Sequence, residues 1–117
     1  MNILEIEEAF NQSHSKEDSF RALVKISKTL HKIETDQKTN ENAVTGCESQ
    51  AWLVAKQDVN TALWHFKADS DAKLIRGFLA IILAHTEGLT SEEIQKLDLI
   101  SSLDKLNLGA YLTSSRN

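Results

Sequence analysis

The sequence predicts an α+β fold in which a small antiparallel sheet packs against several helices. Two neighbouring runs rich in aromatic and β-branched residues, at 50–56 and 62–68, predict the sheet. On both sides of these runs, apolar residues recur every three or four positions, which is typical of amphipathic helices. The expected order of elements is therefore two helices, two strands and three helices.

The N-terminal part of the chain is expected to form two helices. Apolar residues at helical spacing predict a short helix over residues 2–10. Ser15 is a typical N-cap because Asp18 follows three positions later, and we expect the second helix to run from 16 to 33. Residues 34–42 are polar and have no apolar period, which predicts an exposed loop.

The two β-rich runs should form an antiparallel hairpin, since only residues 57–61 separate them. Successive side chains of a strand point to opposite faces of the sheet. Trp64 and Phe66 therefore share one face, which we expect to lie against the core. Leu63 and His65 are expected on the other, partly solvated face.

The C-terminal half is expected to contain a long central helix and two short ones. Ser70 is predicted to cap the central helix, with Asp71 in the first turn, where the helix dipole favours a negative charge. Gly88 is expected to end this helix in a left-handed conformation. The run Thr90-Ser91-Glu92-Glu93 predicts the next helix start, and a last helical turn is expected over 102–108.

Composition restricts the classes of function. The 117 residues carry 13 Lys and Arg against 17 Asp and Glu, a net charge of −4, which argues against nucleic-acid binding. The longest apolar stretch, 77–84, is far shorter than the ~20 residues of a membrane span. Because the acidic N-terminus also lacks the basic region of a signal peptide, we expect a soluble, cytoplasmic protein. The chain has one cysteine and no nucleotide-, phosphate- or metal-binding motif, so neither a cofactor nor a metal is expected.

Cys47 is the candidate nucleophile. A lone cysteine is more often an inert, buried, small apolar residue than a reactive one. Cys47 instead follows Gly46 at the end of a polar loop, directly before a predicted strand, where a thiol can be presented to a partner. Glu41 and Glu48 would disfavour the thiolate if they lie close in space, so activation would come from a helix N-terminus, a basic group or a partner protein. The residues alone leave both interpretations open.

Three segments resemble the sequence pattern of the SufE family. Residues 41–52, ENAVTGCESQAW, are similar to the pattern E-N-x-V-x-G-C-x-S-x-x-W. Residues 68–80, ADSDAKLIRGFLA, are similar to A-D-S-D-A-x-I-V-R-G-L-L-A, and residues 112–116, LTSSR, to L-S/T-P-S-R. The three segments occur in the family's order, and the resemblance covers the chain from residue 16 onward.

This resemblance implies a SufE/IscU-like fold and a sulfur relay. Family members accept sulfur from a pyridoxal-phosphate cysteine desulfurase of the SufS/CsdA kind, stimulate it, and pass the sulfur on to an iron–sulfur scaffold or another acceptor. Cys47 matches the position that carries the cysteine persulfide. Asp71, Arg76 and Arg116 match family positions that are expected to bind the desulfurase or to shape the cysteine segment. Alternatively, these residues only cap a helix or form ion pairs on the surface.

The chain also departs from the family pattern. Ser114 stands where the family has proline, and Tyr111 stands where a histidine is usual. The chain stops at Asn117, where family members normally continue into another helix. We therefore expect one SufE-like domain over residues 1–117 that lacks this C-terminal helix.

Two other functions remain open at this point. The protein could be an adaptor that binds the desulfurase while Cys47 is dispensable. It could instead be an iron–sulfur scaffold, although such a site needs about three thiolate or imidazole ligands and the chain has one cysteine. A sulfur carrier that activates a desulfurase is expected rather than a stand-alone enzyme.

Overall fold

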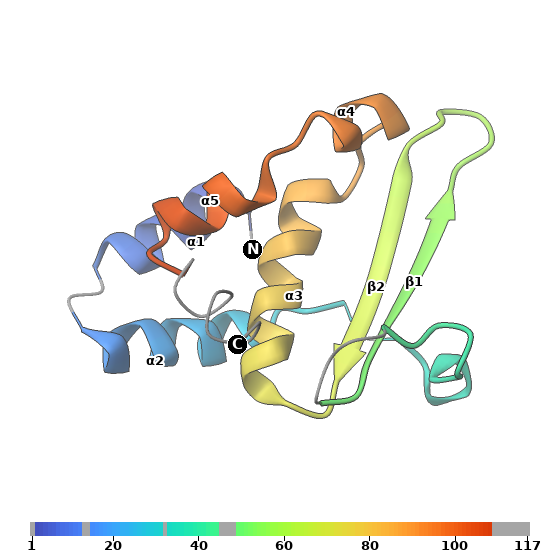
Figure 1. Ribbon diagram of the computed structural model, residues 1–117. Helices are drawn as coiled ribbons and strands as arrows, with labels where there is room; N and C mark the ends of the chain where they lie inside the picture. The colour runs from blue at the N-terminus through green and yellow to red at the C-terminus, as the bar shows by residue number, and fades with distance from the viewer. Residues whose placement is uncertain (1, 13–14, 32, 45–48, 109–117) are drawn as a thin grey trace.

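The computed structural model describes residues 2–12, 15–31, 33–44 and 49–108. Its elements follow the expected order of two helices, two strands and three helices, with one short 3₁₀ turn, η1, before the strands (Figure 1). Their bounds are α1 Ile3–Asn11, α2 Lys16–Ser27, η1 Thr35–Gln37, β1 Ala51–Gln57, β2 Trp64–Ser70, α3 Lys73–Thr86, α4 Ser91–Gln95 and α5 Leu99–Lys105. None of the helices in these described ranges is long and apolar enough to cross a membrane.

Helix α3 lies at the centre of the molecule. It packs against α2 and α1 on one side and against β2 on the other. Figure 1 shows α1, α2 and α5 on the side of α3 that faces away from the hairpin. The two strands pair antiparallel, from Ala51 opposite Ser70 to Gln57 opposite Trp64. The predicted α+β class, with a small antiparallel sheet against several helices, is therefore confirmed.

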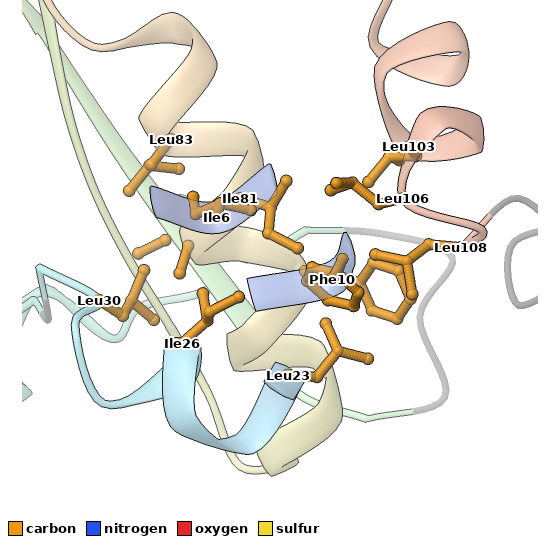
Figure 2. Close-up of a cluster of buried hydrophobic side chains, with 13 residues drawn as sticks. Ile6, Phe10, Leu23, Ile26, Leu30, Ile81, Leu83, Leu103, Leu106 and Leu108 are labelled. Atoms are coloured by element: carbon orange, nitrogen blue, oxygen red, sulfur yellow. The ribbon is translucent and has the colours of Figure 1, made fainter. Parts of the chain in front are cut away.

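A single cluster of buried apolar side chains joins the helices to the hairpin. Figure 2 shows side chains of α1, α2, α3 and the α5 region converging on one volume. Ala68 of β2 is fully buried in this cluster, and Phe66 packs against it. The largest side chains with almost no exposed surface are Ile6, Leu23, Ile26, Ile81 and Leu108.

The second helix is shorter than the predicted span of 16–33, because α2 ends at Ser27. The hydroxyl groups of Ser27 and Thr29 donate to carbonyls of the last helical turn. The chain then runs beside β2, where the N–H of Ala68 donates to the carbonyl of His31 over 3.1 Å. Leu30 and Ile33 continue the helical spacing of apolar residues and are buried although they lie beyond the end of the helix. Their spacing explains why the sequence predicted a longer helix.

The predicted cap of the central helix is wrong. Ser70 is the last residue of β2, Asp71 follows it outside any helix, and Ala72 is the N-cap of α3 without a side-chain hydrogen bond. The Ser70 hydroxyl donates to the carbonyl of Gln50 over 2.6 Å and accepts from the N–H of Ala72 over 3.2 Å. Strand pairing extends to Ser70, so its side chain links two segments of the chain instead of capping a helix.

The predicted faces of the second strand are largely confirmed. Phe66 packs against the core, and His65, on the other face, is exposed. Trp64 is half-buried at the edge, where its ring stacks on Phe66 with 6.2 Å between ring centroids. Its indole N–H donates to the hydroxyl of Ser91 over 2.7 Å.

Of the other three helix boundaries predicted in the C-terminal half, two are confirmed. Gly88 follows α3 with a φ of 75°, which is the left-handed conformation expected of it. Thr90 caps α4 in a capping box with Glu93. The last helix begins earlier than the predicted residue 102, because the carboxylate of Asp98 accepts from the N–H of Ser101 and caps α5 at Leu99.

Candidate functional site

The predicted site residues divide between the described and undescribed parts of the chain. Cys47 and Arg116 lie outside the described residues. Asp71 is exposed in the short connection between β2 and α3, and Arg76 is half-buried in α3. The site is therefore built here from the residues that flank the cysteine segment 45–48 on either side.

The residues upstream of this segment pair with the start of β1. Ala43 forms an isolated antiparallel bridge with Trp52. The N–H of Val44 donates to the carbonyl of Ala51, and the N–H of Leu53 donates to the carbonyl of Asn42, each over 2.9 Å. Residues 42–44, which lead into the cysteine segment, are thus fixed along the edge of β1 that does not pair with β2.

Gln50, downstream of the segment, is held by the last residue of β2 and the residue after it. The carbonyl of Gln50 accepts two hydrogen bonds, from the Ser70 hydroxyl over 2.6 Å and from the N–H of Asp71 over 3.1 Å. Within the described ranges, the Asp71 carboxylate itself makes no hydrogen bond or ion pair. The backbone of Asp71 therefore anchors the motif, while its side chain faces solvent.

An ion pair also links the polar stretch before the motif to the end of β2. Lys38 Nζ lies 3.0 Å from Asp69 Oδ2 and 5.2 Å from the centroid of the Trp52 ring. Trp52 and Asp69 are directly opposite each other in the strand register, so the ammonium group lies over a cross-strand pair. In Figure 1 the segment that carries η1 lies beside the start of β1 and the end of β2.

The environment of Asp69 favours its charged form. Burial alone would raise the pKa of the carboxyl group, whose side chain is only 8% exposed. The hydrogen bonds from Lys38 and from the N–H of Ser70, together with the positive charges of Lys38 and Arg76, outweigh burial and lower the pKa of Asp69 below its usual value. The Nε atom of Arg76 is buried and has no hydrogen-bond partner among the residues that the structure describes.

A second carboxylate holds the opposite end of β2. Glu87, just after α3, accepts from the N–H of Phe66 over 2.8 Å and pairs with the His65 ring. Burial would raise the pKa of Glu87, but the Phe66 N–H, the His65 ring and the nearby charge of His31 together lower it. This pair stabilises the hairpin away from the cysteine motif.

Neither Lys38 nor Asp69 was predicted as a site residue. Lys38 lies in a stretch whose polarity indicated only an exposed loop, and Asp69 precedes two residues that were assigned to a helix start. The register of the two strands places Asp69 opposite Trp52, and only the folded chain shows this register and which cation reaches Asp69. Across the described ranges, no group of three or more His, Cys, Asp or Glu side chains is arranged to hold a metal ion.

Comparison of the sequence with known proteins identifies its family. Residues 4–117 match the SufE family, described as an Fe-S metabolism associated domain. An uncharacterised SufE-like protein of Rhizobium etli is 37% identical over 103 residues, which cover 86% of this chain and 70% of the relative. A second such protein, from Rhizobium meliloti, is 37% identical over 102 residues, covering 86% of this chain and 73% of the relative. The sulfur acceptor protein CsdE of Escherichia coli is 34% identical over 101 residues, covering 86% of this chain and 68% of CsdE. This chain therefore belongs to the SufE family.

Proposed function

We propose that this protein is a sulfur acceptor that takes persulfide sulfur from a pyridoxal-phosphate cysteine desulfurase onto Cys47. The sulfur would then pass to an iron–sulfur scaffold or another acceptor. The observation that carries this proposal is membership of the SufE family, with Cys47 at the cysteine of the motif at 41–52. A relative that is 34% identical is itself a sulfur acceptor protein. A cytoplasmic location agrees with a lone cysteine that has to remain a thiol.

The proposed reaction is a thiol–persulfide exchange. The Cys47 thiolate attacks the terminal sulfur of the desulfurase persulfide, and the bond between the two desulfurase sulfurs breaks. The desulfurase leaves as a thiolate, and Cys47 carries the persulfide. One sulfur–sulfur bond forms while another breaks, so no external oxidant or reductant is needed. Removal of the sulfur frees the desulfurase cysteine for another turnover, which would stimulate the desulfurase.

The surroundings of the motif support docking of a partner protein. Val44, which directly precedes the cysteine segment, and Leu53 of β1, which bonds to Asn42, expose 39% and 38% of their surface. A protein that docks over the cysteine segment would bury this apolar area, which favours association. The solvent-facing carboxylate of Asp71 lies on the adjoining connection. We propose that Asp71, Arg76 and Arg116 help to bind the desulfurase.

The proposal is tested by intact-mass measurement. The wild-type protein and a Cys47→Ser variant are incubated with free cysteine and a catalytic amount of cysteine desulfurase. We expect the wild type alone to gain one sulfur atom, which a reducing agent removes. Binding to the desulfurase without any gain of sulfur would instead support the adaptor function. Equal stimulation of the desulfurase by the Cys47→Ser variant would also contradict the relay.

A further inference from the structure

We infer that Lys38 and Asp69 are positioning residues for sulfur transfer at Cys47, because they hold the chain that leads into the cysteine motif against the hairpin. The inference rests on the proposed function and extends it to an ion pair outside the motif 41–52. The pair joins a residue of the polar stretch to the end of β2.

The acidic partner of the ion pair is shielded from water, whereas Lys38 stays partly exposed. The Asp69 side chain is 8% exposed and that of Lys38 is 31% exposed, and their charged atoms are 3.0 Å apart. The ring of Trp52 lies 5.2 Å below the Lys38 ammonium group and adds a cation–π attraction. Exposed ion pairs contribute little to stability, whereas removing one partner of a shielded pair leaves the other charge uncompensated. Loss of either charge should therefore release the polar stretch from β2.

The end of β2 and the residue after it thereby hold the chain on both sides of the cysteine segment. Asp69 holds Lys38 upstream of the segment, while Ser70 and Asp71, which follow it directly, hold the carbonyl of Gln50 downstream. The pairing of residues 42–44 with β1 lies between the upstream ion pair and the segment. When the ion pair is lost, residues 42–44 keep their backbone hydrogen bonds to β1 and the hydrogen bond that the Asn42 side chain donates to the carbonyl of Gln37 over 2.7 Å.

Such an anchor affects the rate of the reaction through geometry. A thiolate must meet the persulfide sulfur at a short distance and in line with the bond that breaks, and small displacements of a reacting group are costly in rate. Lys38 and Asp69 would act through the backbone of residues 42–44, not by touching the sulfur.

The matched control is the ion pair at the other end of the same strand. Glu87 pairs with His65 and accepts from the N–H of Phe66, so it also fixes β2 through a carboxylate. A Glu87→Gln variant removes that charge at a distance from the motif. A role limited to general stability predicts similar effects of Glu87→Gln and Asp69→Asn.

The first measurement is amide hydrogen exchange in the 117-residue protein, without a desulfurase. We expect Lys38→Met and Asp69→Asn to speed exchange at the N–H groups of Val44 and Leu53 about tenfold or more, because each variant removes a charge-assisted hydrogen bond. Lys38→Arg, which keeps the charge and can still pair with a carboxylate and an aromatic ring, and Glu87→Gln should leave these two amides unchanged. Unchanged exchange in Lys38→Met and Asp69→Asn, or an equal increase throughout α3, would overturn the inference.

The second measurement is the rate at which the same variants gain sulfur from a catalytic amount of cysteine desulfurase. We expect Lys38→Met and Asp69→Asn to slow the gain about tenfold, while Lys38→Arg and Glu87→Gln keep the wild-type rate. A wild-type rate in Asp69→Asn, together with faster exchange at Val44 and Leu53, would show that the anchor does not serve the transfer. If the wild type gains no sulfur at all, the proposed function fails, whereas the exchange experiment still decides whether the ion pair holds the chain.

Discussion

Asp69 is the one buried acidic side chain among the described residues, and its charge is balanced by Lys38 and Arg76. Its pKa is lowered in the folded protein, so the unfolded chain binds this proton more tightly than the folded one does. The ion pair therefore stabilises the fold fully above the unfolded pKa of about 4. This stabilisation is lost as the pH falls through the lower pKa of the folded state.

We predict that Asp69→Asn lowers the free energy of unfolding by about 1–3 kcal/mol at pH 7, because the variant removes a charge-assisted hydrogen bond in a shielded position. The difference in free energy of unfolding between wild type and variant should shrink as the pH falls below about 4, where the unfolded chain takes up the proton, and vanish below the lower pKa of Asp69 in the folded protein. Urea unfolding at pH 7 and at several acidic pH values measures both quantities. A difference that stays constant over this range would show that the charge of Asp69 does not stabilise the fold.

The contact between helices α2 and α3 depends on a glycine. A Cβ atom at Gly77 would lie 2.7 Å from the carbonyl oxygen of Leu23 and 3.1 Å from its Cβ. Leu23 is fully buried, and the nearest atom is backbone, so α2 cannot move aside at that point without disturbing the core. The glycine thus allows the two helices to approach closely.

We predict that Gly77→Ala destabilises the protein even though alanine is the better helix former. The helix propensity would favour alanine by about 1 kcal/mol. Overpacking at the α2–α3 contact costs about 1–3 kcal/mol and the closest contact is with backbone, so the net effect is a loss. Urea unfolding followed by circular dichroism measures the change in the free energy of unfolding. An increase in stability for Gly77→Ala would contradict the close packing of α2 and α3.

The whole molecule depends on one core that spans the helices and the hairpin. Ile81 of α3 is 1% exposed and belongs to the same cluster as Ala68 of β2 and Leu23 of α2. Both tryptophans of the chain lie in the hairpin, so fluorescence reports on the sheet while far-ultraviolet circular dichroism reports on the helices. The two signals therefore test whether the chain unfolds as one unit.

We propose that the chain is a single domain, and we predict that the two signals change at the same urea concentration. Ile81→Ala should lower the free energy of unfolding by about 2–5 kcal/mol and shift both transitions together, because it leaves a cavity in the shared core. Separate transitions in the wild type, or a shift of only the circular dichroism signal in Ile81→Ala, would show that the hairpin unfolds independently.

The sequence alone determined the class of the fold, the order of its elements and the family, because these depend on local patterns. Apolar spacing, the turn between the two strands, the left-handed Gly88 and the capping box at Thr90 each involve residues close together in the chain. The motif that contains Cys47 is likewise contiguous, so the candidate nucleophile could be identified before the fold was known.

Only the tertiary structure decided how distant segments meet around that motif. Helix α2 ends at Ser27 because the chain turns to lie beside β2, and Ser70 bonds Gln50 instead of capping α3 because the strands pair to their ends. The contact between Lys38 and Asp69 depends on the same strand pairing, which brings Asp69 opposite Trp52. No local pattern specifies such contacts, because their free energy comes from burial and from the neighbours that the folded chain supplies.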